Sequence, residues 1–194
     1  MMRDLVKPTL ALLVITLFAA LIIGVTYAVT EEPIRTQRAN VEMAAVRALL
    51  PATYELEEIS VPEGTSLTRA AKSFDQWGAH IGYVVFAAPS GYSGRVYVMV
   101  AFSHHPLLHI EGVRIINHTE TPGLGSQITQ DAFLHAFEEV TFAHRALDGW
   151  IVPRIVEAGR DVPAIANATI SVNAVLRGVN DAIAFMYERG PSAW

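Results

Sequence analysis

A hydroxyl group stands where a helix is expected to begin near the end of the chain. Residues 164–175 read AIANATISVNAV and lead into a regular apolar pattern, which places Thr169 at or just before a helix N-terminus. The first backbone N–H groups of a helix lack an intrahelical acceptor and the helix N-terminus is electrically positive, so a phosphate is favoured there. Thr169 or Ser171 could instead be only a helix cap. Spacing alone favours the cap, because nearly every helix needs one.

The helix behind Thr169 is predicted from a single apolar stripe. Apolar residues recur there at spacings of three and four, which places them on one face of an amphipathic helix. They are Val172, Val175, Leu176, Val179, Ile183 and Met186.

A second stretch that could approach a ligand is HTETPGLGSQI, residues 118–128. Pro122 presets φ at one turn position, Gly123 tolerates a positive φ at the next, and Gly125 removes another side chain. Such a loop brings bare backbone close to whatever lies above it, as a planar ring would require. Glycine and proline are common in loops, so this motif taken alone favours an ordinary strand-to-helix turn.

The elements that must position these motifs begin with a membrane span. Residues 8–30 carry no charge, and about 20 apolar residues suffice to cross the hydrocarbon core as a helix. Basic residues precede the run and Glu31 and Glu32 follow it, so the positive-inside rule places residues 1–7 in the cytoplasm and the bulk of the chain outside the cell membrane. A cleaved signal peptide is the alternative, but the run is longer than the apolar region of a typical signal peptide.

One domain on a stalk is predicted beyond the membrane. Residues 31–50 repeat apolar side chains at roughly helical spacing, and Pro51 would end that stalk helix. Residues 51–194 mix turn signals with alternating segments, which is typical of an antiparallel sheet with helices. Expected strands are 80–88, 95–102, 109–117 and 150–156, and a helix is expected at 128–140.

One of these strands already indicates how the sheet is covered. Val96, Val98 and Val100 should share one face, and Tyr97, Met99 and Ala101 the other. Both faces therefore look covered by other elements.

Composition excludes several classes of function. The chain has no cysteine, so disulfides, thiol chemistry and cysteine-ligated metal centres are ruled out. Its net charge is −5 and no stretch interleaves basic and aromatic residues, so nucleic acid is not expected as a partner. His104, His105 and His109 span a predicted turn without enough convergent ligands, and no metal site is expected. No catalytic triad or phosphate-binding loop is found.

Taken together, the motifs resemble one known family in their order along the chain. After the apolar span come GYSG at 91–94, ETPGLG at 120–125, a strand that starts at Trp150, and the helix start AT-x-S-x-x-AV from Ala168 to Val175. This order resembles the FMN-binding G subunit of the Rnf electron-transport complex, a family shared with the C subunit of the sodium-translocating NADH:quinone reductase. The resemblance covers essentially the whole chain, and ETPGLG is its most specific element.

The resemblance implies a fold class and a cofactor. The fold class is α+β, with a single N-terminal transmembrane helix followed by one extracytoplasmic FMN-binding-type domain that has an antiparallel sheet and flanking helices. In this family a separate flavin transferase joins the phosphate of FMN to a threonine hydroxyl, which here would be that of Thr169. The residues expected to bind the cofactor are Thr169, Ala168, Asn167, Ser171, Glu120, Thr121, Pro122, Gly123, Leu124 and Gly125.

The chain departs from the family next to the attachment residue. Ala166 and Asn167 stand where the family has Ser or Thr followed by Gly, and Pro163 stands where an Asp is usual. Asn is the best substitute for Gly at a positive φ, so the turn could survive. Asp161 lies two residues before the usual Asp and is a candidate to replace it. Three states remain open: covalent FMN on Thr169, FMN held without a bond, or a flavin-free protein.

Two functions follow as hypotheses. The first is a flavin-carrying electron-transfer subunit of a membrane-bound, ion-translocating oxidoreductase complex of Rnf type, linked to ferredoxin and NAD. Such a chain acts as an enzyme only within a multi-subunit translocase of the cell (inner) membrane, with no catalytic residue and no substrate chemistry of its own. Its partners would be other membrane subunits and, during maturation, a flavin transferase. The alternative is a membrane-anchored assembly or binding subunit that has lost covalent flavin.

Overall fold

The computed structural model describes residues 2–104, 109–138, 143–145, 151–153 and 155–189. The chain divides into two compact units, Met1–Met43 and Ala44–Trp194. The helix α1 (Met2–Leu49) makes up the first unit and continues into the second.

Within the first unit, helix α1 has the properties of a membrane span. By length and composition it is the one helix in the described part of the chain that could cross a bilayer. The hydroxyls of Thr16, Thr26 and Thr30 donate hydrogen bonds to carbonyls four residues earlier, at 3.0, 2.8 and 2.7 Å. These polar groups therefore need no water, which suits a helix in hydrocarbon. The helix runs through Pro33, so the expected stalk is continuous with the apolar run.

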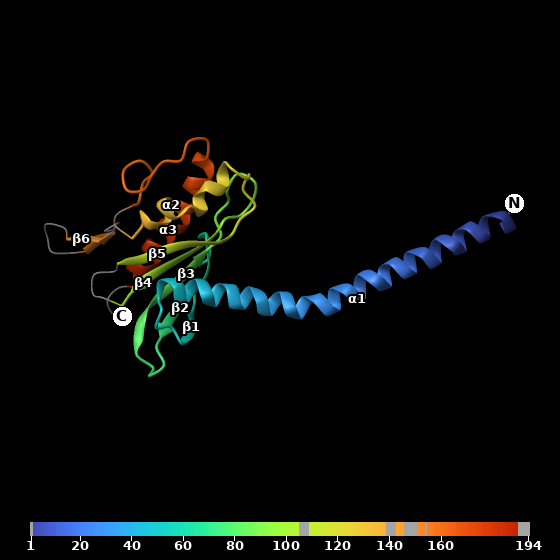
Figure 1. The fold of residues 1–194 in the computed structure, drawn as a ribbon, viewed down its shortest axis with the longest axis horizontal. Helices are drawn as coiled ribbons and strands as arrows, with labels where there is room; N and C mark the ends of the chain where they lie inside the picture. Colours follow the sequence, from blue (N-terminus) through green and yellow to red (C-terminus); the bar gives the residue numbers. More distant parts are fainter. Residues whose placement is uncertain (1, 105–108, 139–142, 146–150, 154, 190–194) are drawn as a thin grey trace. The chain divides into compact units, whose positions relative to one another are not determined.

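The second unit is built on a five-stranded antiparallel sheet (Figure 1). Each strand pairs with the next one in the chain, so the sheet is a meander. Its strands are β1 (Glu55–Ile59), β2 (Leu67–Phe74), β3 (His80–Ala87), β4 (Tyr97–Ser103) and β5 (Ile110–Asn117). The last three confirm the expected strands, whereas β1 and β2 were not predicted.

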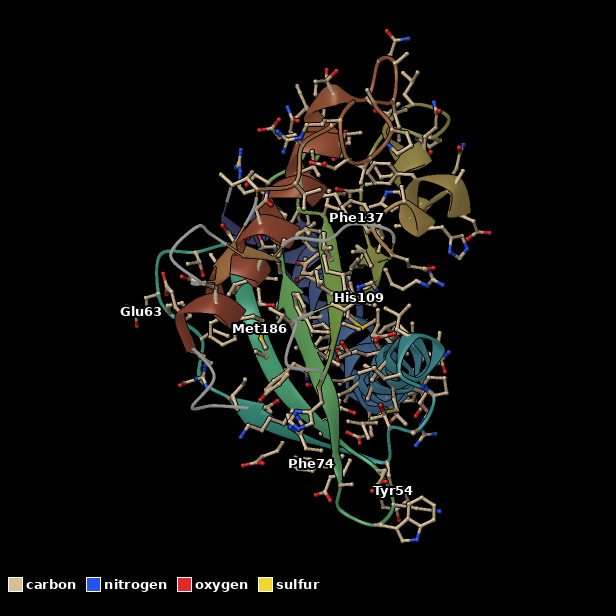
Figure 2. All side chains as sticks on the ribbon, turned by 90° about the vertical axis from the view of Figure 1, so that its left-hand side faces the viewer. Tyr54, Glu63, Phe74, His109, Phe137 and Met186 are labelled. Carbon is tan, nitrogen blue, oxygen red and sulfur yellow. The ribbon has the colours of Figure 1, made fainter. Side chains whose placement is uncertain are left out.

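Both faces of this sheet are covered, as the pattern of β4 predicted. Val98 and Val100 lie in a core cluster with α3 (Thr169–Arg189), to which Phe137 and Met186 also belong (Figure 2). Met99 lies in a second cluster on the other face. That second cluster includes Val46 near the end of α1 and the following Leu50. Tyr97, by contrast, is 43% exposed.

The segment after β5 differs from the expected long helix at 128–140. It forms a 3-10 helix, η1 (Gly125–Thr129), and a five-residue helix, α2 (Asp131–His135). The N–H groups of Phe137 and Glu138 donate to carbonyls only three residues earlier, so the α-helical pattern ends there. The packing that the apolar spacing predicted is nevertheless present, since Phe133 and Phe137 are buried with ring centroids 5.4 Å apart.

A short second sheet pairs β6 (Ala143–Arg145) with β7 (Ile151–Pro153). The strand expected at 150–156 is thus shorter, and Trp150 lies outside the described residues.

Candidate functional site

Three segments that are far apart in the sequence meet at one buried carboxylate. Glu120 begins the ETPGLG loop and is only 4% exposed. Its Oε1 accepts hydrogen bonds from the backbone N–H groups of Tyr92 at 2.9 Å and Ser93 at 3.1 Å, both in the GYSG turn. Its Oε2 accepts a hydrogen bond from the hydroxyl of Ser171, in the first turn of α3. One side chain therefore holds the GYSG turn, the ETPGLG loop and the start of α3 together.

Two glycines make room for this carboxylate. A Cβ atom on Gly91 would lie 2.4 Å from Glu120 Oε1. A Cβ on Gly125 would lie 2.7 Å from Ser171 Oγ and 2.8 Å from Glu120 Oε2. All three distances are shorter than those that packed atoms adopt, so a larger residue at either position must displace the Glu120 contacts.

The turn predicted within ETPGLG is confirmed. The N–H of Leu124 donates to the carbonyl of Thr121 at 3.2 Å, and Gly123 has φ 75°. With Pro122 between them, this is a turn that requires a residue tolerant of positive φ at its third position. A Cβ on Gly123 would have no neighbour within 4 Å, so the backbone conformation, rather than lack of space, requires glycine here.

Thr169 is the first residue of α3, as the spacing predicted, and its side chain is exposed. The first helical hydrogen bond runs from the N–H of Val172 to the carbonyl of Ala168 at 2.9 Å, which makes Ala168 the capping residue. Ser171 turns its hydroxyl to Glu120 instead of capping the helix. The interpretation of Thr169 or Ser171 as a simple cap therefore does not fit, and within the described residues the Thr169 hydroxyl has no hydrogen-bond partner.

The backbone before Thr169 has the conformation for which Asn was expected to replace Gly. Asn167 has φ 61° and is the one non-glycine residue with positive φ in the ranges that the structure describes. Asn tolerates this left-handed region better than other side chains. Ala168, next to it, is buried at 3% exposure. The positive φ that the sequence led us to expect at Asn167 is therefore present.

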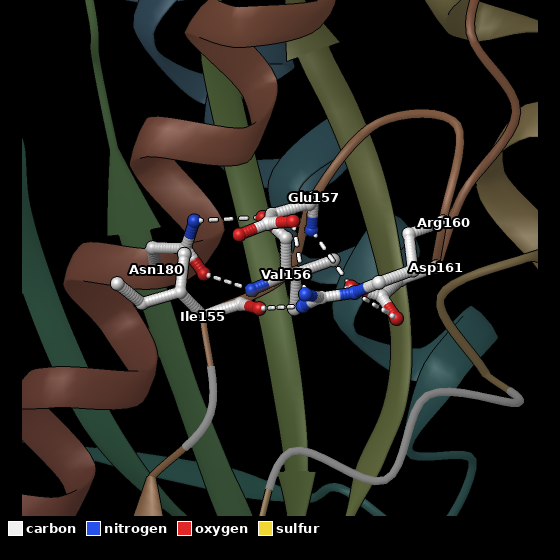
Figure 3. A network of polar contacts seen from close by, with 6 residues as sticks. All are labelled: Ile155, Val156, Glu157, Arg160, Asp161 and Asn180. Carbon is white, nitrogen blue, oxygen red and sulfur yellow. Dashed lines mark hydrogen bonds and ion pairs between the residues drawn. The ribbon is translucent and has the colours of Figure 1, made fainter.

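Asp161 was the candidate to replace the Asp that the related family usually has before the attachment residue. Its carboxylate makes contacts within the turn at 155–161 (Figure 3). Its Oδ2 accepts a hydrogen bond from the N–H of Glu157 at 2.8 Å. Arg160 lies between the two acids, with guanidinium nitrogens 2.9 Å from Glu157 Oε2 and 3.1 Å from Asp161 Oδ2. These contacts close the turn at 155–161, and they give Asp161 a structural role there.

Asn180 fastens this turn to α3. Its Oδ1 accepts the N–H of Val156 at 2.8 Å and its Nδ2 donates to the Val156 carbonyl at 3.1 Å (Figure 3). The amide side chain thus pairs with both backbone groups of Val156, as a neighbouring strand would.

The histidines have local roles in the structure. The Nδ1 of His118, just after β5, accepts the N–H of Glu120 at 3.2 Å. His104 and His109 are exposed, while His105 lies outside the described residues. No group of three potential metal ligands comes together among the residues that the structure describes.

Sequence reasoning missed His80. Its ring centroid lies 4.1 Å from that of His104. Burial and the neighbouring His104 lower the pKa of His80 below its ordinary value. No pattern in the sequence pointed to this pair, because the two rings meet across β3 and the end of β4.

Sequence reasoning also missed two exposed apolar side chains at the site. Tyr92 in the GYSG turn is 70% exposed and Ile170, next to Thr169, is 54% exposed. Leu124 in the ETPGLG loop, which was among the predicted residues, is 45% exposed. Each of the three segments that Glu120 joins therefore presents one large apolar side chain, which a planar ring could contact.

This chain is similar in sequence to known proteins. Residues 91–184 match the family model of the FMN-binding domain, a range that begins in the GYSG turn and ends within α3. A Methanosarcina acetivorans protein, named as the G subunit of an ion-translocating oxidoreductase complex, is 27% identical over 188 residues, 95% of each chain. A Clostridium ljungdahlii protein, named as the G subunit of a proton-translocating ferredoxin:NAD(+) oxidoreductase complex, is 27% identical over 88% of this chain and 86% of that one.

A third relative and a solved structure match parts of the chain. A Pseudomonas aeruginosa protein, also named as the G subunit of an ion-translocating oxidoreductase complex, is 34% identical over 101 residues, which are 51% of this chain and 45% of that protein. The crystal structure of Shewanella oneidensis NqrC has 25% sequence identity and a TM-score of 0.45, and it covers 68% of this chain and 66% of its own.

The fold and the matched residues define a protein with one apolar N-terminal helix and an FMN-binding domain. The resemblance to the G subunits of the Rnf complexes, inferred from the motifs, is confirmed by relatives that match over nearly the whole chain.

Proposed function

We propose that this chain is the flavin-carrying electron-transfer subunit of a membrane-bound ion-translocating oxidoreductase complex of Rnf type, with FMN attached through its phosphate to Thr169. One observation carries the proposal: Thr169 presents an exposed hydroxyl at the first position of α3, within the matched FMN-binding domain. The names of the full-length relatives support the kind of complex.

The residues at the start of α3 fit a phosphate. The N–H groups of Thr169, Ile170 and Ser171 precede the first helical hydrogen bond, so they are free of helical acceptors. These groups and the helix dipole favour a negative group on the Thr169 oxygen. α3 is 21 residues long, so its dipole is well developed. The exposed apolar side chains of Tyr92, Leu124 and Ile170 supply surface for the ring system.

Attachment requires an activated flavin donor, because an alcohol does not displace hydroxide from a free phosphate. A donor of the right class is a flavin dinucleotide, in which the FMN phosphate forms an anhydride with a nucleoside monophosphate. The Thr169 Oγ1 attacks that phosphorus, the O–P bond to threonine forms as the anhydride bond breaks, and the nucleoside monophosphate leaves. The hydroxyl proton passes to a base of the transferase, and no group is oxidised or reduced.

The chain holds and orients the cofactor, and FMN supplies the redox chemistry when it is bound. A covalent bond keeps the flavin at a high effective concentration outside the cytoplasm, where a dissociated molecule would be diluted. We place the domain there by the charge difference across the apolar run, with residues 1–7 in the cytoplasm and the span in the inner membrane. The partners are then other membrane subunits of the complex, which deliver and receive electrons.

A second candidate is an assembly subunit without covalent flavin. Pro163 and Ala166, which replace the residues usual in the family, favour it because a transferase must recognise this stretch.

In-gel fluorescence separates the two candidates. The full-length chain is produced in cells with an active flavin transferase and run on a denaturing gel under ultraviolet light. We expect a fluorescent band at 21.2 kDa that is absent in Thr169→Val, while Thr129→Val, a matched change at another exposed hydroxyl, keeps it. A dark wild-type band means that the chain carries no covalent flavin, and a visible spectrum of the native sample then detects unattached FMN.

A further inference from the structure

We infer that Glu120 is a positioning residue for the attachment of FMN, because it turns the Thr169 hydroxyl outward at the start of α3. The inference rests on the proposed function, in which Thr169 receives the flavin. It adds a buried residue that lies 49 positions before Thr169 in the chain (169 − 120 = 49).

The geometry of the first turn of α3 explains how Glu120 acts on Thr169. Successive helical residues are about 100° apart, so Thr169 and Ser171 point in nearly opposite directions, about 200° apart around the axis. Ser171 is 2% exposed and its hydroxyl donates to Glu120 Oε2. With Ser171 held inward, the Thr169 side chain must face outward, and it is indeed exposed.

Glu120 also fixes what lies around the hydroxyl. Its second oxygen holds two successive N–H groups, those of Tyr92 and Ser93. A carboxylate can direct two amides and one hydroxyl at the same time, which an apolar side chain of the same size cannot do. The GYSG turn is therefore held in a fixed place relative to the start of α3, and a transferase meets one arrangement of both.

The free-energy cost of burying the Glu120 carboxylate supports a positioning role for this residue. Burying a charged side chain is unfavourable unless its lone pairs are satisfied, and even then the net gain in stability is small. Here both oxygens are satisfied, and Gly91 and Gly125 leave the space that they need. The Glu120 contacts therefore serve to orient the start of α3 and the GYSG turn more than to stabilise the fold.

The test compares initial rates of FMN incorporation into the full-length chain by a purified flavin transferase supplied with flavin adenine dinucleotide. We expect Glu120→Ala to lower kcat/KM for the chain about tenfold or more, since it leaves two amides and one hydroxyl without their acceptor. Glu120→Gln keeps an oxygen for Tyr92 and Ser93 and should recover much of the rate. Ser171→Ala removes only the contact to α3 and should lower the rate in the same direction.

Asp181 provides the matched control. It is also an acid that fastens α3 to another element, because its Oδ2 accepts the N–H of Ser66 at 2.9 Å. It lies twelve residues beyond Thr169 on the same helix (181 − 169 = 12). We expect Asp181→Ala to lower the melting temperature while its rate of modification stays within about twofold of the wild type.

The outcomes distinguish a failure of the positioning role of Glu120 from a failure of the proposed function. If the wild type incorporates FMN and Glu120→Ala does so at the same rate, the positioning role is wrong and the proposed function stands. If Asp181→Ala loses modification as strongly as Glu120→Ala at an equal loss of melting temperature, Glu120 acts only through stability and the inference is also wrong. If Glu120→Ala does not fold, the rate of Ser171→Ala takes its place: a lowered rate of FMN incorporation supports the positioning role, and an unchanged rate overturns it. If the wild type takes up no FMN, both proposals fall.

Discussion

Two polar clusters fasten a loop to helix α3, and they do so in different ways. The Glu120 cluster is buried and joins residues up to 51 positions apart. The cluster at 155–161 has a half-exposed Arg160 between two acids, and these acid and guanidinium contacts are local, while Asn180 links the turn to α3 (Figure 3). The local contacts close a turn, whereas the long-range contacts of Glu120 orient the first residues of α3. We therefore expect changes in the first cluster to affect flavin attachment and changes in the second to affect stability alone.

The largest difference should come from adding one methyl group to a glycine in each cluster. Gly125→Ala places a Cβ 2.7 Å from Ser171 Oγ and should cost about 2 kcal/mol or more of unfolding free energy, with loss of flavin attachment. Gly159→Ala meets open space but has φ 78°, so it should cost only about 1 kcal/mol and keep attachment. Chemical denaturation and in-gel fluorescence measure the two effects. Equal loss of attachment in both variants would remove the distinction between the clusters.

The next effect concerns the link between the second cluster and α3. Asn180→Ala removes the partner of both the N–H and the carbonyl of Val156, and should destabilise the domain by about 1–2 kcal/mol. Attachment of FMN at room temperature should be unchanged, because Glu120, and not Asn180, holds the start of α3. Loss of attachment in a variant that is still folded at that temperature would contradict the comparison.

A smaller effect is expected at the turn that precedes Thr169. Asn167→Ala must hold φ near 61° without a side chain suited to it and should lose about 1 kcal/mol, whereas Asn167→Gly should retain the wild-type stability. Attachment should follow the same order, with Gly at least as good as Asn. Melting curves and the fluorescent band report both quantities. If Ala and Gly behave alike, the positive φ does not matter for the site.

The smallest effect is a pH dependence that comes from a residue outside both clusters. The pKa of His80 is lowered by burial and by His104, so the unfolded chain takes up the proton first as the pH falls below 6.5. The contribution of neutral His80 is thus present above that pH and declines below it. Melting temperatures measured about one pH unit above and one below that value should differ less in His80→Gln than in the wild type. An identical difference in both would exclude His80 as the source.

The parts of the fold that followed from the sequence are those with a strong repeat. The alternation in β4 and the apolar stripe of α3 predicted the correct elements and the correct faces. Strands β1 and β2 were missed because charged residues interrupt any alternation, as Glu57 and Glu58 do in β1. The helix expected at 128–140 was too long, since Phe133 and Phe137 have helical spacing but the N–H groups just beyond α2 donate to carbonyls three residues earlier.

The site could be predicted only in its separate pieces. The turn at Gly123 and the helix start at Thr169 are local, and local patterns indicated both. The contact between Glu120 and Ser171 depends on how the sheet and α3 pack, and no short-range pattern encodes such a contact. The same holds for the ring contact between His80 and His104.

The intact mass of the full-length chain, purified from cells with an active flavin transferase, tests the central claim most directly. We expect the polypeptide mass plus one FMN joined with loss of water, with the addition mapped to the peptide that contains Thr169. A sample that has only the bare polypeptide mass would contradict covalent attachment, and the chain would then have to act in its complex without a tethered flavin.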